Sequence, residues 1–581
     1  MKRFNNPAFW RLFKYVWKYW YDVVLVLAMA FAGVFASLYS VILIGDAIDV
    51  MVDGSVDFTQ LWKIVAIIAG LTVVYMVVEW LTEVFAARIT YKAVKDIRQD
   101  VFDTIQNVPL SYLDSHKTGE LLSKMVVDVD QISDGLILAL TQFFTGVVTV
   151  IGTIIIMMSI NYKIGLIVVL ITPVSLVLAG FISKMTRKHF KKQSDIRGEI
   201  ASQVQDAVSA QTLYKTCSYL EKSEEAFEKT NEDLEKVSIK AIFMSSLPNP
   251  TSRFVNNIIY ALTGLVGALA VIGGGAFMLT VGQLTMFLTY AQKYAKPFNS
   301  ITDVLTEIES ATASAERVFG LMDAVRELPD ANNALVLKDV DGSVELNNVS
   351  FSYVKDKELI KGLNLKAKPG QNIAIVGRTG CGKTTLINLL MRFYDVDDGE
   401  IKVSGHNIND MTRDSLRTSY GMVLQDSYIF VGTIRDNIKF GREASDEEVI
   451  EAAEKARAYS FIKRQPQGLD TVISENSNLS EGQRQLLCIA RAMLHLPQML
   501  ILDEATSSVD TRTEIKIQQA FDAMMKDRTC FVVAHRLSTI KNADMILVMD
   551  KGHIIEQGTH EELLKANGFY TELYNSQFAQ K

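Results

Sequence analysis

Long apolar runs in the first half of the chain set the strongest limit on its fold. A helix of about 20 apolar residues crosses the ~30 Å hydrocarbon core of a bilayer. Runs suited to that role lie at residues 23–43, 64–80, 136–158, 164–182, 258–272 and 279–290. Hydrophobic residues make up 49% of the 581 and are concentrated before residue 306. We therefore predict more than one domain, of which the first is all-α and spans the membrane six times.

The charges that flank the first run predict its orientation. Basic residues precede it, namely Lys2, Arg3, Arg11, Lys14 and Lys18. Acidic residues follow it, namely Asp46, Asp49, Asp53 and Asp57. Because positively charged flanks stay in the cytosol, we expect a multi-pass protein of the cytoplasmic membrane with its N-terminus inside. An even number of spans also returns the C-terminus to the cytosol.

The connections between the runs are unequal in length. Residues 9–20 are aromatic and basic, which favours a helix of about residues 8–20 in the inner interface over a cleaved signal peptide. The outside connection 159–163 is short, whereas the inside stretches 87–133 and 183–241 are long, charged and helix-patterned. Antiparallel helices of roughly 28 residues would project about 40 Å from the membrane. Such helices are suited to transmitting motion from the second domain to the spans. The alternative is that they are solvated coiled-coil stalks with no such role.

A change in composition marks the domain boundary. Residues 312–341 have no apolar run of membrane length and read as a linker between a membrane domain, 1–311, and a second domain, 342–581. Within the second domain, residues 344–353 show the patchy alternation of a half-exposed strand. The cysteines Cys217, Cys381, Cys488 and Cys530 all fall on the expected cytosolic side, so we predict reduced thiols rather than disulfides.

Residues 377–385, GRTGCGKTT, match the phosphate-loop pattern Gly-x-x-x-x-Gly-Lys-Thr. An apolar stretch at 372–376 reads as a buried strand before the loop, and 385–390 opens a helix after it. In such loops glycines let backbone N–H groups approach phosphate oxygens, and a lysine adds a positive charge. We assign nucleotide binding to Gly377, Arg378, Thr379, Gly380, Cys381, Gly382, Lys383, Thr384 and Thr385.

The residue types in and after this loop predict ATP hydrolysis with Mg²⁺. Lys383 should reach the β- and γ-phosphates, and the Thr384 hydroxyl should ligate the metal. Residues 500–503 read as a second buried strand that ends in Asp503, whose carboxylate can hold the Mg²⁺ shell. Glu504 follows, where it can orient or deprotonate the attacking water. His535, after the apolar stretch 530–534, could contact the γ-phosphate, although a single histidine there is more often structural.

The whole series of motifs resembles the ATP-binding cassette (ABC) exporters over essentially the entire chain. Tyr353 is similar to their adenine-stacking aromatic, and Gln425 to the glutamine that links Mg²⁺ and the attacking water to the membrane helices. His535 is similar to their switch histidine, and residues 112–120 to their first coupling segment. Residues 507–510, with Ser508 and Asp510, resemble the loop that crosses the dimer interface. The family also has a signature segment that acts on the nucleotide of the partner chain. Its counterpart here comprises residues similar to it, namely Leu479, Ser480, Glu481, Gly482 and Gln483.

This resemblance implies a dimeric machine driven by ATP and Mg²⁺. Each ATP would lie between the phosphate loop of one chain and the signature of the other, so that nucleotide holds two α/β phosphate-loop domains, each with a helical subdomain, together. Closure would favour an outward-facing membrane cavity, and hydrolysis would reset it. ATP then shifts the equilibrium through its different affinity for the two states.

One departure from the family pattern concerns the signature. Glu481 replaces a glycine, and residues 475–477 also differ from the usual Glu-Arg-Gly. A carboxylate beside a polyphosphate is repulsive, so the site that uses this signature should be impaired, while Glu504, Gln425 and His535 look intact for the other site. This pattern favours pairing with a second, non-identical chain. The alternative is a homodimer in which the Glu481 side chain turns to solvent.

The substrate is the least constrained prediction. We expect export of hydrophobic or amphipathic solutes of the multidrug type, with membrane lipids but no nucleic acid as partners. A homodimeric lipid or peptide exporter shares every motif, and the motifs leave uptake open. A nucleotide-gated channel or regulatory subunit is disfavoured by Glu504. Glu79 marks either a cationic-substrate path or a side chain that snorkels to the headgroups. The spans also carry aromatic and methionine side chains that either line a permissive substrate cavity or take part in ordinary packing, namely Phe143, Phe144, Met157, Met158 and Met278.

Overall fold

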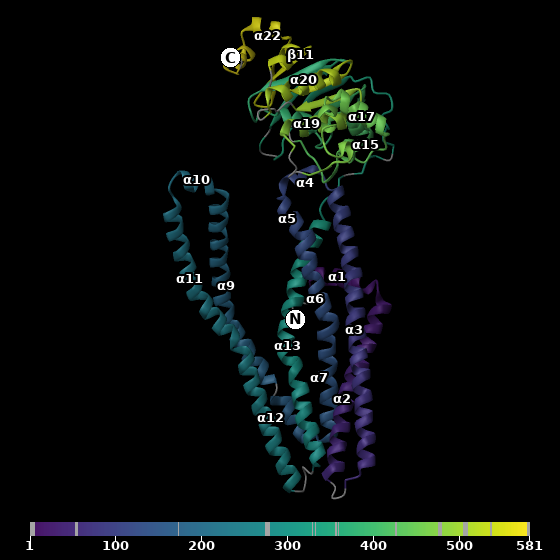
Figure 1. Ribbon diagram of the computed structural model, residues 1–581, viewed down its shortest axis with the longest axis vertical. Helices are drawn as coiled ribbons and strands as arrows, with labels where there is room; N and C mark the ends of the chain where they lie inside the picture. Colours follow the sequence, from purple (N-terminus) through teal and green to yellow (C-terminus); the bar gives the residue numbers. More distant parts are fainter. Residues whose placement is uncertain are drawn as a thin grey trace. The chain divides into compact units, whose positions relative to one another are not determined.

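The chain folds into two compact units in a computed structural model (Figure 1). The structure describes residues 6–577 except 53–55, 172, 274–278, 328, 332, 355–356, 358, 425–426, 475–478, 504–508 and 535–536. The helical unit comprises Met1–Asn107 and His116–Ala324, and the α/β unit comprises Val325–Lys581 together with the short segment Val108–Ser115. The first coupling segment predicted from the sequence is thus divided between the two units.

The helical unit contains helices only, within its described residues. They are α1 (Pro7–Trp17), α2 (Trp20–Val52), α3 (Phe58–Asn107), α5 (Thr118–Ser123), the π-helix η2 (Lys124–Asp128), α6 (Val129–Leu138), the π-helix η3 (Ala139–Phe143), α7 (Phe144–Ile160), α8 (Tyr162–Ile171), α9 (Pro173–Ser209), α10 (Gln211–Thr216), α11 (Leu220–Ser246), α12 (Pro248–Gly273) and α13 (Val281–Met322). The expectation of an all-α first domain is therefore confirmed.

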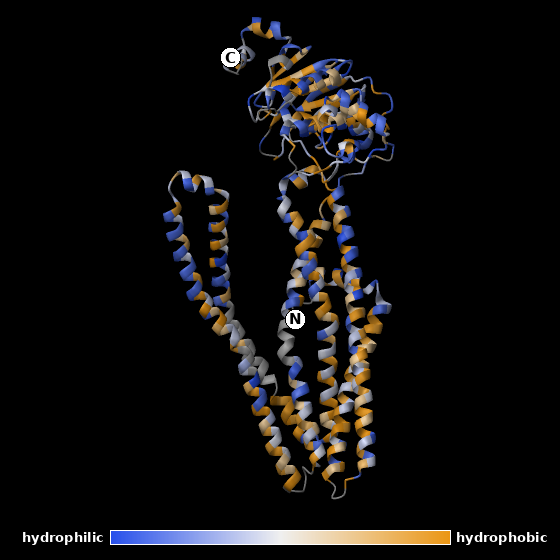
Figure 2. Ribbon diagram, viewed as in Figure 1, coloured by the Kyte–Doolittle hydropathy of each residue, from blue (hydrophilic) through white to orange (hydrophobic). Residues whose placement is uncertain are grey.

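By length and composition, four described helical segments can cross a membrane. They are Trp20–Val52, Phe58–Asn107, Thr118–Ile160 and Arg253–Ile272, and their apolar stretches stand out in Figure 2. The fourth run predicted from the sequence is divided between the shorter apolar helix α8 and the start of α9, and the sixth forms the first part of α13. The count of six spans stays a prediction.

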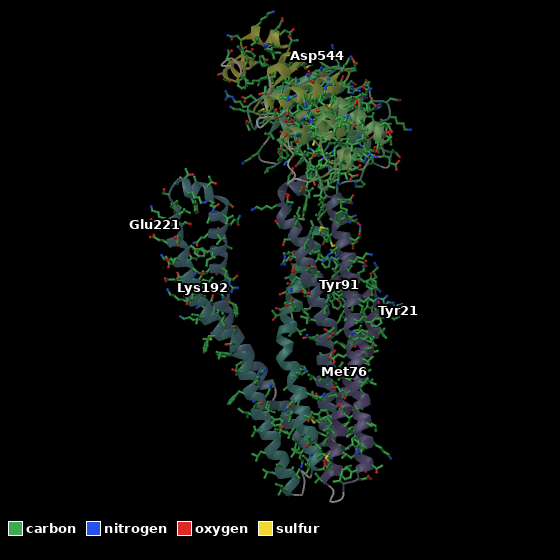
Figure 3. The ribbon with its side chains drawn as sticks, viewed as in Figure 1. Tyr21, Met76, Tyr91, Lys192, Glu221 and Asp544 are labelled. Carbon is green, nitrogen blue, oxygen red and sulfur yellow. The ribbon has the colours of Figure 1, made fainter. Side chains whose placement is uncertain are left out.

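A long helix pair occupies the second of the two helix-patterned stretches, residues 183–241. Helices α9 and α11 lie side by side (Figure 1). Gln193 donates a hydrogen bond of 2.8 Å to the Ser238 hydroxyl, and Gln203 donates one of 3.0 Å to Thr230, so polar contacts join the two helices. Charged side chains such as those of Lys192 and Glu221 project from this pair (Figure 3). A polar surface of this kind suits a helix pair surrounded by water.

Helices α2 and α13 approach closely near the end of α2. A Cβ atom on Gly282 would overlap the carbonyl oxygen of Gly45, so only glycine fits there. Asp49 accepts hydrogen bonds from the Thr280 hydroxyl (2.6 Å) and from the backbone N–H of Gly282 (2.7 Å). Thr280 in turn caps α13 in a capping box with Gln283. The carboxylate of one helix thereby satisfies the free N-terminus of the other.

An ion pair with a buried carboxylate joins η2 to α13. Asp128 is 7% exposed and accepts hydrogen bonds from the Ser314 hydroxyl (3.1 Å) and from Arg317 Nε (3.0 Å). A second nitrogen of the Arg317 guanidinium also donates to this carboxylate, which makes the pair bidentate. Beside it, a Cβ atom on Gly135 would overlap Ala311, so α6 and α13 pack without a gap.

Helix α13 extends beyond the limit that the sequence predicts for the membrane domain. The predicted linker starts at residue 312, yet α13 continues to Met322 and the boundary between the compact units lies after Ala324. Ala315, Val318 and Phe319 are buried at helical spacing, and their burial explains why the helix continues. The residues that follow belong to the α/β unit, in which Arg413 pairs with Glu327 (3.1 Å) and Asp330 (2.8 Å).

The α/β unit is built on a six-stranded sheet of order β12-β11-β3-β10-β9-β6. Its strands β3 (Asn372–Gly377), β6 (Tyr420–Val423), β9 (Met499–Asp503), β10 (Thr529–Val533) and β11 (Met545–Asp550) are parallel, and β12 (His553–Gly558) is antiparallel. A second, antiparallel sheet has the order β2-β1-β4-β5. Its strands are β1 (Val344–Phe351), β2 (Ile360–Ala367), β4 (Asp398–Val403) and β5 (His406–Asn407).

Helices surround these sheets and form a helical subdomain. They are α4 (Leu110–Ser115), α14 (Lys383–Leu390), α15 (Arg413–Thr418), α16 (Ile434–Lys439), α17 (Asp446–Lys455), α18 (Tyr459–Ile462), α19 (Glu481–Leu494), α20 (Thr511–Met525), α21 (Leu537–Lys541), α22 (His560–Ala566) and α23 (Phe569–Gln577), with a short ribbon of β7 (Gly432–Thr433) and β8 (Val472–Ile473). One core lies between the two sheets and α14, and a second joins α16, α17, α19 and α20. The predicted α/β architecture is confirmed.

Candidate nucleotide site

The phosphate loop follows β3 and leads into α14, as the sequence predicts. Buried strand β3 pairs with β10 and β11, which fixes where the loop begins. Gly380 and Gly382 have φ angles of 80° and 105°, a region that L-residues with side chains rarely adopt. A Cβ atom on Gly377 would overlap the carbonyl oxygen of Met549. The three glycines therefore allow the tight backbone path of this loop.

Lys383 lies across the loop that it terminates. Its Nζ donates hydrogen bonds to the carbonyl oxygens of Gly377 (2.8 Å) and Arg378 (3.2 Å). Cys381 is 3% exposed, and burial raises the pKa of its thiol, so the thiol remains neutral at neutral pH. Thr384 is exposed at the start of α14, whereas Thr385 is buried. The exposed hydroxyl suits a metal or phosphate ligand, and the buried one supports the loop.

Tyr353 lies beside the helix that follows the phosphate loop. Its hydroxyl donates a hydrogen bond of 3.2 Å to Thr385 Oγ1 and accepts one of 3.4 Å from Asn388. Its ring contacts Phe351 and Tyr394 edge-on, with centroids 4.9 and 5.0 Å apart. The ring is held at its edge while the side chain stays 47% exposed. An aromatic face beside a phosphate loop is suited to stacking on a base.

Asp503 lies at the same edge of the parallel sheet as the phosphate loop. It ends β9 and pairs in register with Val533 of β10, which pairs with Ile375 of β3. The carboxylate and the exposed Thr384 hydroxyl are hard oxygen donors, the kind that Mg²⁺ prefers. The described residues therefore fit the metal that the sequence predicts.

Several predicted site residues lie outside the described residues. They are Gln425, Glu504, Ser508 and His535. The strands that precede three of them, β6, β9 and β10, end at Val423, Asp503 and Val533 in adjacent register positions. In open α/β sheets, ligands bind beyond the carboxyl ends of the strands. The roles of these four residues stay predictions.

The signature forms the N-terminus of α19. Ser480 caps this helix, because its hydroxyl oxygen accepts a hydrogen bond of 3.3 Å from the Gln483 N–H while the Gln483 side chain accepts one of 3.0 Å from the Ser480 N–H. A Cβ atom on Gly482 would lie 2.5 Å from Thr513 Cγ2, so glycine is needed for α19 to pack against α20. Leu479 is buried. The Ser480 O–H proton remains available to a ligand.

Glu481 is the first residue of α19, and its side chain is half exposed. Its carboxylate lies 3.8 Å from the Arg484 guanidinium, and the side chain is 46% exposed. An exposed pair at that distance offsets little charge. Asp510, which follows the undescribed residues, caps α20 by accepting a hydrogen bond from the Thr513 N–H (3.0 Å), and this backbone hydrogen bond lowers the Asp510 pKa. No hydrogen bond or ion pair joins residues 479–483 to the phosphate loop among the described residues.

The structure also brings two residues to the site that sequence reasoning does not single out. The Tyr394 hydroxyl donates a hydrogen bond of 2.5 Å to Asp114 of α4, and its ring contacts Tyr353. Burial, together with this hydrogen bond, raises the Tyr394 pKa. Asp114 is part of the predicted coupling segment, but its partner is 280 residues away. No local pattern could have revealed that contact.

Fold and site together define a membrane protein with a phosphate-loop nucleotide-binding unit. Residues 23–295 match the family model described as ABC transporter transmembrane region, and residues 360–507 match the family model described as ABC transporter. The chain belongs to the ABC transporter family, as an exporter that couples ATP hydrolysis to transport across a membrane. The resemblance predicted from the motifs is thereby confirmed at the level of the family.

Named relatives and a solved structure match nearly the whole chain. A fatty acid ABC transporter ATP-binding/permease protein of Mycobacterium bovis is 37% identical over 89% of this chain and 82% of its own length. An ATP-dependent lipid A-core flippase of Syntrophus aciditrophicus is 34% identical over 96% of this chain and 92% of its own. The structure of a bacterial Atm1-family ABC exporter with ATP bound superposes with a TM-score of 0.77 at 30% identity, covering 96% of this chain and 97% of that one.

Proposed function

We propose that this chain is one half of a two-chain exporter that moves amphipathic, multidrug-type or lipid-like solutes across the cytoplasmic membrane, with both termini in the cytosol. The observation that supports the two-chain part is that, among the described residues, no hydrogen bond or ion pair joins the phosphate loop to the signature of the same chain. Two similar proteins bear the names of a fatty acid transporter and a lipid A-core flippase, both of which imply amphipathic cargo.

Within this proposal, the residues of one chain hold the nucleotide. Tyr353 stacks on adenine, the backbone N–H groups of residues 377–385 bind phosphate oxygens, and Lys383 exchanges its carbonyl partners for the β- and γ-phosphates. Thr384, Asp503 and Gln425 would hold Mg²⁺, which offsets phosphate charge when bound.

Glu504 is the proposed catalytic base, and His535 the proposed contact to the γ-phosphate. The attacking water gives its proton to the Glu504 carboxylate as its oxygen bonds to the γ-phosphorus, and the bond to the β–γ bridging oxygen breaks, which leaves ADP and phosphate. Ser480 and the other signature residues act on the nucleotide of the partner chain, with Ser508 and Asp510 at the interface. This arrangement makes dimerisation a condition for turnover.

The proposal assigns the two chains different sequences because of Glu481. Its carboxylate stands at the start of the helix whose N-terminus would face the γ-phosphate, and the pair with Arg484 offsets little of its charge. The composite site that uses this signature would be degenerate, while the site that uses Glu504 would be competent. The exposure of the Glu481 side chain, 46%, is the observation that favours the alternative, a homodimer in which this side chain turns to solvent.

The test is ATP hydrolysis by the purified chain in lipid, alone and together with a second exporter chain that has an intact signature. We expect strong hydrolysis only in the mixture, and we expect Glu504→Gln to abolish it while ATP binding persists. A homodimer of this chain that hydrolyses ATP at full rate, with no gain from Glu481→Gly, would overturn the two-sequence assignment. Transport that survives Glu504→Gln would instead indicate a nucleotide-gated channel or regulatory subunit.

A further inference from the structure

A partly open cavity of about 500 Å³ lies in the helical unit, lined by residues of α2, α3, η3, α7 and α13. Its position is within the apolar part of the unit, because Gly33 and Ser37 lie near the middle of the candidate span α2. A volume in this range suits a small ligand or the polar end of a larger amphiphile.

The charged residues of this cavity come from two helices and have opposite signs. Glu79 and Glu83 are one turn apart on α3, and Lys293 and Lys296 are one turn apart on α13. These four are the charged residues of the lining, so the formal charges cancel. Among the residues that the structure describes, no ion pair within 4.0 Å joins the two sets or involves any of the four.

Lys293 is held in place by neutral groups. Its Nζ donates hydrogen bonds to the Ser37 hydroxyl (2.5 Å) and the Ser37 carbonyl oxygen (3.2 Å), and the side chain is partly buried. One turn earlier on α13, the Tyr290 hydroxyl donates to the carbonyl oxygen of Leu38 (2.7 Å), which fixes this part of α13 against α2. The ammonium group therefore has a fixed position, and its charge has no described counter-ion.

Ionisable side chains within a membrane domain are costly, and they commonly mark functional sites. A ligand with only negative charge would meet Lys293 favourably but would be repelled by Glu79 and Glu83, and a cationic ligand would meet the reverse. A ligand that carries one charge of each sign can satisfy both sets, while apolar side chains such as Met29, Val34 and Leu38 receive its hydrocarbon part.

We infer that this cavity binds zwitterionic amphiphiles, with the anionic group at Lys293 and Lys296 and the cationic group at Glu79 and Glu83. This inference rests on the proposed export function and narrows its substrate class. The sequence alone favoured Glu79 either as part of a cationic-substrate path or as a snorkelling side chain. The lysines that line the same cavity would repel a purely cationic ligand, so we expect a zwitterionic ligand instead.

The test is equilibrium binding to the full-length protein, with its partner chain where assembly needs one, in a non-ionic detergent. Three probes share the same fluorescent short acyl chain: phosphatidylcholine (zwitterionic), phosphatidylglycerol (anionic) and a trimethylammonium diacyl analogue (cationic). We expect phosphatidylcholine to bind at least about fivefold more tightly than the other two, because only it pairs with both sets of charges. Competition with unlabelled dodecyl sulfobetaine separates the possible sources: displacement means that any zwitterionic solute suffices, and lack of displacement means that the phospholipid headgroup is required.

Variants then connect the preference to the cavity. Lys293→Met and Glu79→Gln should each reduce phosphatidylcholine binding by about tenfold, whereas Lys63→Met, an exposed position on α3 outside the cavity, should not change it. Because Lys293→Met also removes the hydrogen bonds to Ser37, the charge-swapped double variant Lys293→Glu/Glu79→Lys serves as a second test and should restore zwitterion binding above either single reversal. Equal binding of all three probes, or equal loss in the control, would overturn the inference.

ATP hydrolysis measured on the same samples separates this inference from the proposed function. Glu504-dependent hydrolysis together with equal binding of the three probes would reject the zwitterion site and leave the exporter intact. Absence of hydrolysis in every preparation would reject the proposed function, whatever the binding results.

Discussion

The hydroxyl group of Tyr394 donates a hydrogen bond of 2.5 Å to the carboxylate of Asp114. The ring of Tyr394 contacts Tyr353, and the Tyr353 hydroxyl reaches Thr385 at the start of the phosphate-loop helix. The segment Val108–Ser115, which continues the long helix α3 along the chain, is thereby connected through two tyrosines to the place proposed for adenine.

We predict that Tyr394→Phe weakens this connection without harming nucleotide binding. The phenylalanine ring retains the contact with Tyr353, so the affinity for ATP should stay within about twofold, while stimulation of ATP hydrolysis by transported solute should fall by about half or more, since a hydrogen bond to a charged group contributes roughly 1.5–3 kcal/mol. Substrate-stimulated hydrolysis and nucleotide titration measure the two effects separately.

Asp114→Asn provides the matching test of the same contact. If the two side chains act together, the double variant should be no worse than either single variant, which a double-mutant cycle detects. Tyr428→Phe, at an exposed tyrosine of the same unit, is the control. Additive losses would contradict a shared role.

We predict that Gly282→Ala destabilises the helical unit. The added methyl group would overlap the carbonyl oxygen of Gly45 and the Asp49 side chain, so α2 and α13 must separate at a cost of about 1–3 kcal/mol. Gly70→Ala on α3 is a matched control, because a Cβ atom there has no neighbour within 4 Å. Thermal unfolding of both variants in detergent, followed by loss of monodispersity, should show a lower melting temperature for Gly282→Ala alone.

We predict that Arg317→Met is more damaging than the removal of an exposed ion pair. The change leaves the Asp128 carboxylate, 7% exposed, with only Ser314 among its described partners, and breaking a buried pair costs about 3–5 kcal/mol, reduced here because the Arg317 side chain is 53% exposed. Lys236→Met, which removes an exposed i,i+4 pair with Glu232, should cost less than about 0.5 kcal/mol. Similar melting temperatures for the two variants would contradict the importance of the Asp128 cluster.

The C-terminal region should lose stability on acidification through His560. Its ring Nδ1 lies 2.7 Å from the Tyr570 hydroxyl, and burial, followed by the nearby Lys541, lowers the His560 pKa. The unfolded chain then binds a proton at this residue more readily than the folded chain, so stability rises with pH and is lost as pH falls through about 6.5, the unperturbed value. We expect the free energy of unfolding to change less between pH 7.5 and pH 5.5 in the His560→Gln variant than in the wild type. All other groups titrate equally in the two proteins, so the remaining difference reports on His560.

Local patterns predicted the parts of this structure whose causes are local. The phosphate loop appears where strand, glycines and helix follow one another. Residues 312–322, which have no apolar run of membrane length, continue helix α13 because Ala315, Val318 and Phe319 are buried at helical spacing. The contacts of Asp128 with Arg317 and of Asp114 with Tyr394 depend on chain segments 189 and 280 residues apart, which no periodicity encodes.

The glycine contact between α2 and α13 has a mechanical consequence. Where two backbones touch with no side chain between them, neither helix can slide or rotate past the other without losing the Asp49 cap as well. The end of α2 at Val52 and the start of α13 at Val281 are therefore expected to behave as one rigid body. If the protein opens at this end of the helical unit, we expect α2 and α13 to move together, as one body, away from the neighbouring helices.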